Sequence, residues 1–78
     1  MDKNKIREEY IELLDKHKTT YIMFQEQKTM EYRDYYDQQG QYNLGFLNAI
    51  YLIDEEFGME LDQMTLEFYR ENNFGLGE

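Results

Sequence analysis

Apolar residues recur at spacings of three and four along the first third of the chain, which places them on one side of a helix. Neither Gly nor Pro interrupts residues 2–39, and Gly40 suits the left-handed position that often follows a helix. The pattern predicts a first helix over about residues 3–39. Its apolar stripe consists of Ile6, Tyr10, Leu13, Leu14, His17, Tyr21 and Phe24.

Residues 19–24 are rich in β-branched and aromatic side chains, and residues 30–36 could form a partner strand. The connection, residues 25–28, contains none of the residues that hairpin turns require and consists mostly of good helix formers. Helix is therefore favoured, and an α+β fold with a β-hairpin at about 19–36 is the alternative.

Residues 42–57 carry apolar side chains on nearly every side, which is typical of a buried central helix. Gly58 would end this second helix. Asp62 suits the N-cap of a third helix over about 62–72, and Leu61 with Leu66 could form a hydrophobic staple around it. The prediction is a single all-α domain over 1–78, with a long N-terminal, a central apolar and a short C-terminal helix.

A first helix of that length would extend roughly 55 Å at 1.5 Å per residue. The second helix could not cover all of it, so part would be bare, bent or packed against another chain. This reasoning suggests a possible homodimer in which two first helices pair. The expected dimer seam consists of Ile6, Tyr10, Leu13, His17 and Phe24.

Charge is the most distinctive property of the composition, because the net charge is −9. Residues 40–78 contain eight acidic side chains and one basic side chain, Arg70. Such a surface repels nucleic acid phosphates and anionic lipid, and it favours a protein partner with a basic surface. We therefore expect no direct binding to nucleic acid and none to membranes.

The chain offers few groups for catalysis. It has no Cys and no Ser, so the usual Cys or Ser nucleophiles are excluded, and no glycine-rich phosphate loop is present. His17 is the only histidine and lies on an apolar stripe, whereas metal sites need several converging ligands. We expect a protein that is not an enzyme and that has no metal or cofactor.

The lack of Cys fits a reducing compartment. Residues 49–53 form the longest apolar run, which is far too short to cross a bilayer, and the start of the chain does not resemble a secretory leader. The expected location is the cytoplasm.

Tyrosines alternate with acidic residues between positions 31 and 37. On a helix the tyrosines would form one patch and the carboxylates an adjacent edge, an arrangement suited to an Arg/Lys-rich partner. Equally, these tyrosines could simply cover the start of the second helix. With a second acidic group further along, the expected partner-binding residues are Glu31, Tyr32, Asp34, Tyr35, Tyr36, Asp37, Asp54, Glu55, Glu56 and Glu60.

These features favour an interaction protein that inhibits its target by occupying a basic surface, one that could otherwise hold nucleic acid. In size and charge, though in no motif, the chain is similar to small helical inhibitors made by phages and other mobile elements. The alternative is a structural or adaptor homodimer without an inhibitory role.

Overall fold

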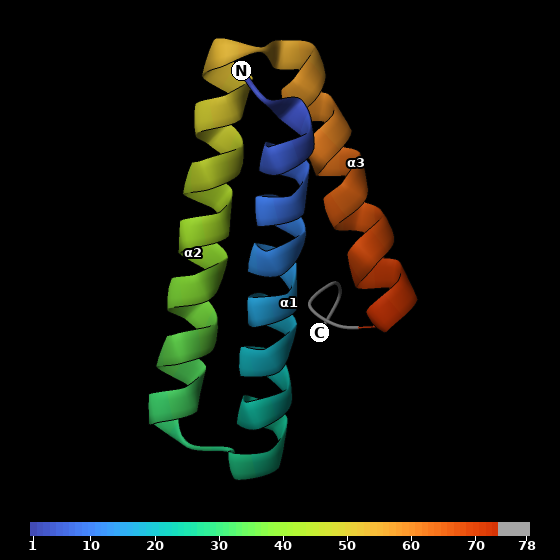
Figure 1. Ribbon diagram of the computed structural model, residues 1–78. Coiled ribbons are helices and arrows are strands. Elements are labelled where there is room, and N and C mark those ends of the chain that lie inside the picture. Colours follow the sequence, from blue (N-terminus) through green and yellow to red (C-terminus); the bar gives the residue numbers. More distant parts are fainter. Residues whose placement is uncertain (74–78) are drawn as a thin grey trace.

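A computed structural model describes residues 1–73 (Figure 1). Three antiparallel helices follow one another: α1 (Lys3–Gln27), α2 (Met30–Ile53) and α3 (Glu55–Asn72). The predicted all-α fold is confirmed. Residues 19–36 are helical on both sides of a short turn, so the alternative with a β-hairpin is wrong.

The first predicted helix is in fact two helices. Lys28 adopts the left-handed conformation (φ 53°), and its N–H donates to Phe24 O at 2.7 Å, which ends α1. Thr29 then caps α2, its hydroxyl accepting from Tyr32 N. The predicted end at residue 39 is therefore wrong. Reversal at Lys28 lets the apolar side of one half cover that of the other, which a straight helix could not do.

A single residue joins the other two helices. Asp54 ends α2 and also caps α3, its carboxylate accepting from Phe57 N at 3.1 Å. Gly40 lies inside α2, and Gly58 and Asp62 lie inside α3, so the predicted boundaries at all three positions are wrong. The acidic start of α3 suits the positive end of the helix dipole, which explains why the boundary lies at Asp54.

All three helices contribute to one hydrophobic core. The outer side of α2 is apolar yet exposed: Leu52 has 89% of its surface accessible and Ile53 has 72%. The expectation that α2 would be buried all round is therefore wrong for this side, because α1 and α3 cover only the opposite one. The core consists of Tyr10, Leu13, Leu14, Leu47, Ile50, Phe57 and Leu61.

Candidate partner-binding surface

The two predicted groups of partner-binding residues lie at opposite ends of α2 (Figure 1). Residues 31–37 belong to the first turns of α2, beside the α1–α2 turn, whereas residues 54–60 belong to the α2–α3 junction. A helix of 24 residues is roughly 36 Å long at 1.5 Å per residue. The structure therefore gives two separate acidic patches instead of one surface.

At the α2–α3 junction, two of the predicted carboxylates already have basic partners. Asp54 Oδ2 lies 3.3 Å from Lys3 Nζ, and both carboxylate oxygens of Glu60 accept from Arg7. The Phe57 N–H and Lys3 lower the pKa of Asp54, and the Arg7 guanidinium lowers the pKa of Glu60. These pairs hold the start of α1 against α3.

Glu55 and Glu56 are different, because both are exposed and neither forms an ion pair within residues 1–73. They occupy the first turn of α3, where the N-terminal dipole stabilises negative charge. These two carboxylates are therefore the better candidates for contact with a partner at this end.

The tyrosine patch at the start of α2 also divides into inner and outer residues. The Tyr36 ring stacks on the His17 ring with 4.6 Å between centroids and lies 5.7 Å from that of Tyr21, so Tyr36 helps to pack α2 against α1. Tyr35 is exposed, and its hydroxyl donates to Glu31 at 3.0 Å, which raises the pKa of Tyr35. Tyr32 is half-buried with its ring against that of Tyr35.

The carboxylates of this patch stay on the outside. Asp34 is exposed, and Asp37 forms an exposed ion pair with Arg33 at 4.0 Å. An exposed pair at this distance contributes little to stability. The part of the patch that a partner could reach consists of Glu31, Asp34, Tyr35 and Asp37.

The predicted dimer seam is covered within the chain. Tyr10, Leu13 and His17 are buried, and Ile6 packs against the core; Phe24 is half-buried. Since α2 and α3 cover this stripe, the bare helix that suggested pairing with a second copy does not exist.

His17 lies among aromatic rings, as its place on the apolar stripe indicated. Its Nδ1 is 3.2 Å from the Tyr69 hydroxyl, and Tyr36 stacks on its face. Gly40 lets this ring approach α2 closely, since a Cβ there would lie 3.1 Å from His17 Nε2. Burial lowers the pKa of His17 and raises that of Tyr69 to about 12, so both stay neutral at neutral pH.

A buried amide, which sequence reasoning missed, links α2 to α1. Asn43 Nδ2 donates to Leu13 O at 2.9 Å, and its Oδ1 accepts from Gln39 Nε2 at 2.9 Å. Across the bundle the Tyr10 hydroxyl bonds to Thr65 Oγ1 at 2.5 Å. Such fully satisfied polar contacts fix one register of the helices. The available clue to the first of them was the presence of Asn43 in a mostly apolar segment.

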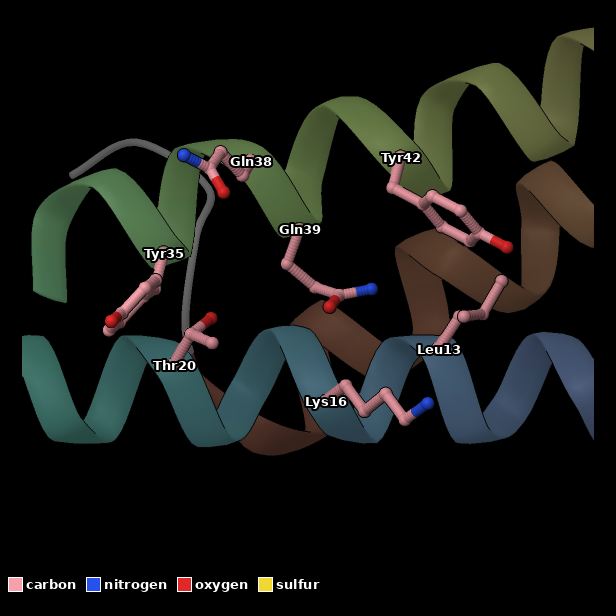
Figure 2. A pocket seen from close by; sticks show the side chains of 7 residues that line it. All are labelled: Leu13, Lys16, Thr20, Tyr35, Gln38, Gln39 and Tyr42. Atoms are coloured by element: carbon pink, nitrogen blue, oxygen red, sulfur yellow. The ribbon is translucent and has the colours of Figure 1, made fainter.

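A groove of about 490 Å³ lies between α1 and α2. Figure 2 shows Gln39 reaching from α2 toward α1 and the Tyr42 ring lying near Leu13, with α3 behind both helices. Lys16 supplies the only charge among the lining residues. Of the predicted partner-binding residues only Tyr35 lines this groove, together with Leu13 from the predicted dimer seam. Its lining consists of Leu13, Lys16, Thr20, Tyr35, Gln38, Gln39 and Tyr42.

A second hollow of about 210 Å³ lies between α1 and α3 and was not predicted. Its apolar side chains come from both helices, and two carboxylates, Glu67 and Glu71, stand among them. The available clue in the sequence was Ile11, an apolar residue beside the predicted stripe; in the structure it is exposed. The lining consists of Ile11, Leu14, Met64, Glu67, Phe68 and Glu71.

Across residues 1–73, no three His, Asp or Glu side chains converge as metal ligands. None of the three described helices combines the length and the apolar character that crossing a bilayer requires. No known protein family, characterised protein or solved structure matches this chain.

Proposed function

We propose that this protein acts by binding a protein partner with a basic surface, and that it inhibits this partner by covering a surface that otherwise holds nucleic acid. One observation carries the proposal. In the described part of the chain, the only carboxylates in ion pairs are those of Asp37, Asp54 and Glu60, so the fold leaves most of its negative charge facing solvent.

The physical basis is electrostatic steering followed by competition. A net charge of −9 on a chain of 78 residues attracts cationic surfaces over about 8–10 Å at physiological salt and speeds encounter with them. A basic site built for phosphates presents Lys and Arg side chains, to which exposed carboxylates offer the same kind of partner. Nucleic acid and this protein would then exclude each other.

Affinity capture with crosslinking and mass spectrometry would identify the partner, and titration of the purified pair would test the proposal. Reversing Glu55, Glu56 and Asp34 to Lys should weaken binding, and added salt should weaken binding by the unaltered chain. Lys5→Glu is the matched control, because it changes an exposed charge in the opposite sense and should not weaken binding.

Two results would contradict the proposal: an affinity that does not depend on ionic strength, and an affinity that is unchanged when Glu55, Glu56 and Asp34 are all replaced by Lys. The inhibitory role has its own test, which is displacement of labelled DNA or RNA from the purified partner. A ternary complex of the two proteins with nucleic acid would refute inhibition by occupancy.

A structural homodimer is the second candidate, and the exposed apolar residues at the α2–α3 junction favour it. Leu52, Ile53 and Met59 are all exposed there, with Leu52 the most accessible at 89%. Light scattering at high concentration distinguishes the two functions. A mass of 9.6 kDa would exclude the homodimer.

A further inference from the structure

The hollow between α1 and α3 combines an apolar floor with acidic edges. Leu14 lies at its base and is only 1% exposed, while Ile11 beside it is 45% exposed. Met64 and Phe68 face them from α3 and are half-buried. A volume of about 210 Å³ can accept a bulky aliphatic or aromatic side chain from another molecule.

On the α3 side, Glu67 and Glu71 line the hollow and are exposed. Glu67 accepts only a weak bond of 3.4 Å from Gln63, and neither carboxylate forms an ion pair with a described residue. Because they are four apart, they lie on one side of α3 and follow the direction of the hollow.

On the α1 side, Glu8 and Asp15 precede and follow Ile11 by three and four residues, so they share its side of the helix. Both are exposed and lack an ion-pair partner among residues 1–73. An apolar strip therefore runs between two rows of carboxylates, one on each helix.

Only some of the basic residues that α1 and α3 carry near this strip are in ion pairs. Arg7 is paired with Glu60, and Lys18 Nζ donates to Asn72 Oδ1 at 2.6 Å. The carboxylates of Glu8, Asp15, Glu67 and Glu71 outnumber the remaining charges, those of Lys18 and Arg70, so the strip has a net negative charge and an apolar centre. A second copy of this chain would bring a further net charge of −9 to it, and nucleic acid would bring phosphates, so both are repelled.

We propose that this hollow, the α1–α3 groove, binds a basic amphipathic helix of the partner protein. One bulky apolar side chain enters between Ile11 and Met64, and Lys or Arg residues on the two flanks of that helix pair with Glu67 and Glu71 on one side and with Glu8 and Asp15 on the other. A helix fits better than an extended strand, because it presents one apolar stripe with cations on both flanks. The inference rests on the proposed function and gives its partner a binding element.

The probe is a synthetic 18-residue helix with Leu and one Trp on one side and Lys and Arg on the other. The chain itself has no Trp, so Trp emission reports on the probe alone. A shift of this emission to shorter wavelength on titration is expected, because the indole leaves water for the groove. A peptide of the same composition in scrambled order should bind at least about tenfold more weakly, a difference of about 1.4 kcal/mol.

Two variants test the location. Glu67→Lys with Glu71→Lys removes the acidic edge of α3, and Ile11→Gln removes an exposed part of the apolar strip. Each should weaken binding of the amphipathic probe by about tenfold or more. The matched controls are Glu9→Lys with Glu12→Lys, which changes net charge equally on another side of α1, and Leu44→Gln, which changes a similarly exposed apolar residue on α2. Circular dichroism must show that every variant remains folded.

The outcomes separate this inference from the proposed function. Equal weakening by both double reversals would mean that charge alone attracts the probe, which overturns the groove and leaves the proposed function standing. If a natural partner binds in a salt-dependent manner and Ile11→Gln does not change its affinity, the groove is again overturned and the proposed function is retained. Self-association of the chain that Ile11→Gln abolishes would assign the groove to a second copy and overturn the inference.

Discussion

The two ends of this bundle are held together in different ways. At the α2–α3 junction, Arg7 and Lys3 from α1 reach carboxylates near the start of α3, and Arg7 also lies over the Phe57 ring at 5.2 Å. Beneath them Phe57 and Leu61 are fully buried. At the α1–α2 turn, in contrast, the contacts are between rings that remain half-exposed, and the ion pair Arg33–Asp37 stays within α2.

The difference follows from the length of α3. This helix has 18 residues, against 25 in α1 and 24 in α2, and its last residue, Asn72, lies beside Lys18. Helix α3 therefore ends well before the α1–α2 turn (Figure 1). Past that point, only α1 and α2 of the described helices lie against each other. Two helices bury less apolar surface than three, so Phe24 stays half-buried. Stability should therefore be concentrated at the α2–α3 end.

The largest effect is expected from truncating the buried residue at that end. Leu61 is 0% exposed, so Leu61→Ala should lower the free energy of unfolding by about 2–5 kcal/mol through lost burial and a cavity. Phe24→Ala at the opposite end should cost less, although it removes more atoms. Urea denaturation followed by circular dichroism measures both. Equal losses would show that the two ends are equally well packed.

A second contrast concerns two glycines in helix interiors. A Cβ on Gly58 would lie 2.6 Å from Tyr51 Cγ and 2.9 Å from Tyr51 Cα, whereas a Cβ on Gly45 would meet nothing within 4 Å. Gly58→Ala should therefore destabilise by about 1–3 kcal/mol through overpacking. Gly45→Ala should stabilise by up to about 1 kcal/mol, because Ala is the better helix former. Thermal unfolding of the two variants gives the signs, and stabilisation by both would refute the close approach at Gly58.

The sequence was sufficient to predict the all-α fold, but not the boundaries between its helices. The spacing of Tyr10, Leu13 and His17 correctly identified the buried side of α1. The predicted outer ends, at about residues 3 and 72, agree with the structure. The internal boundaries are wrong because Gly40 and Gly58 suggest helix ends, although both serve close packing inside helices. Thr29 and Asp54, the residues that start α2 and α3, are good N-caps. Local propensity alone does not show whether a given residue ends a helix or lies inside one at a close contact, since that depends on which helices pack against each other.

The candidate site was harder to predict for a related reason. Acidic residues were visible in the sequence, but their availability depends on long-range pairing, as Glu60 with Arg7 shows across 53 residues. The α1–α3 groove brings Ile11 together with Met64, which are equally distant along the chain. A pattern read within one helix cannot reveal a surface that two helices form together.

The middle of the bundle, where His17 is packed between α2 and α3, and the α2–α3 junction should respond to acid at different pH. Burial holds the folded-state pKa of His17 below its ordinary value of 6.5. At a pH between the folded-state pKa and the ordinary pKa of about 6.5, His17 is protonated in the unfolded chain but neutral in the folded one. The free energy of unfolding therefore falls as the pH drops from about 6.5 through the folded-state pKa. Asp54 and Glu60 have lowered pKa values, and their contribution is lost only below ordinary values of 3.8 and 4.5. Urea titrations from pH 7.5 to 3 should show two steps.

His17→Phe is the control for the upper step, which should disappear in this variant while the lower step remains. Because His17 is the only histidine, its proton resonance in NMR gives the folded-state pKa directly. A value at or above 6.5 would mean that the ring is not desolvated among Tyr36 and Tyr69, and it would contradict the expected upper step.

The smallest effect is expected at the turn between α1 and α2. Thr29 accepts from Tyr32 N at the long distance of 3.4 Å, so Thr29→Ala should cost about 1 kcal/mol or less, toward the lower part of the range for such caps. Thr19→Ala is the matched control, since Thr19 is exposed in mid-helix and Ala there favours the helix.

Amide hydrogen exchange gives a sharper measurement of this effect. If the α1–α2 end opens independently, losing the cap should speed exchange in the first turns of α2 and leave the amides around Leu61 unchanged, because local opening does not require the junction to separate. Equal acceleration at both places would mean that the bundle unfolds only as a unit, and that its ends differ in chemistry but not in stability.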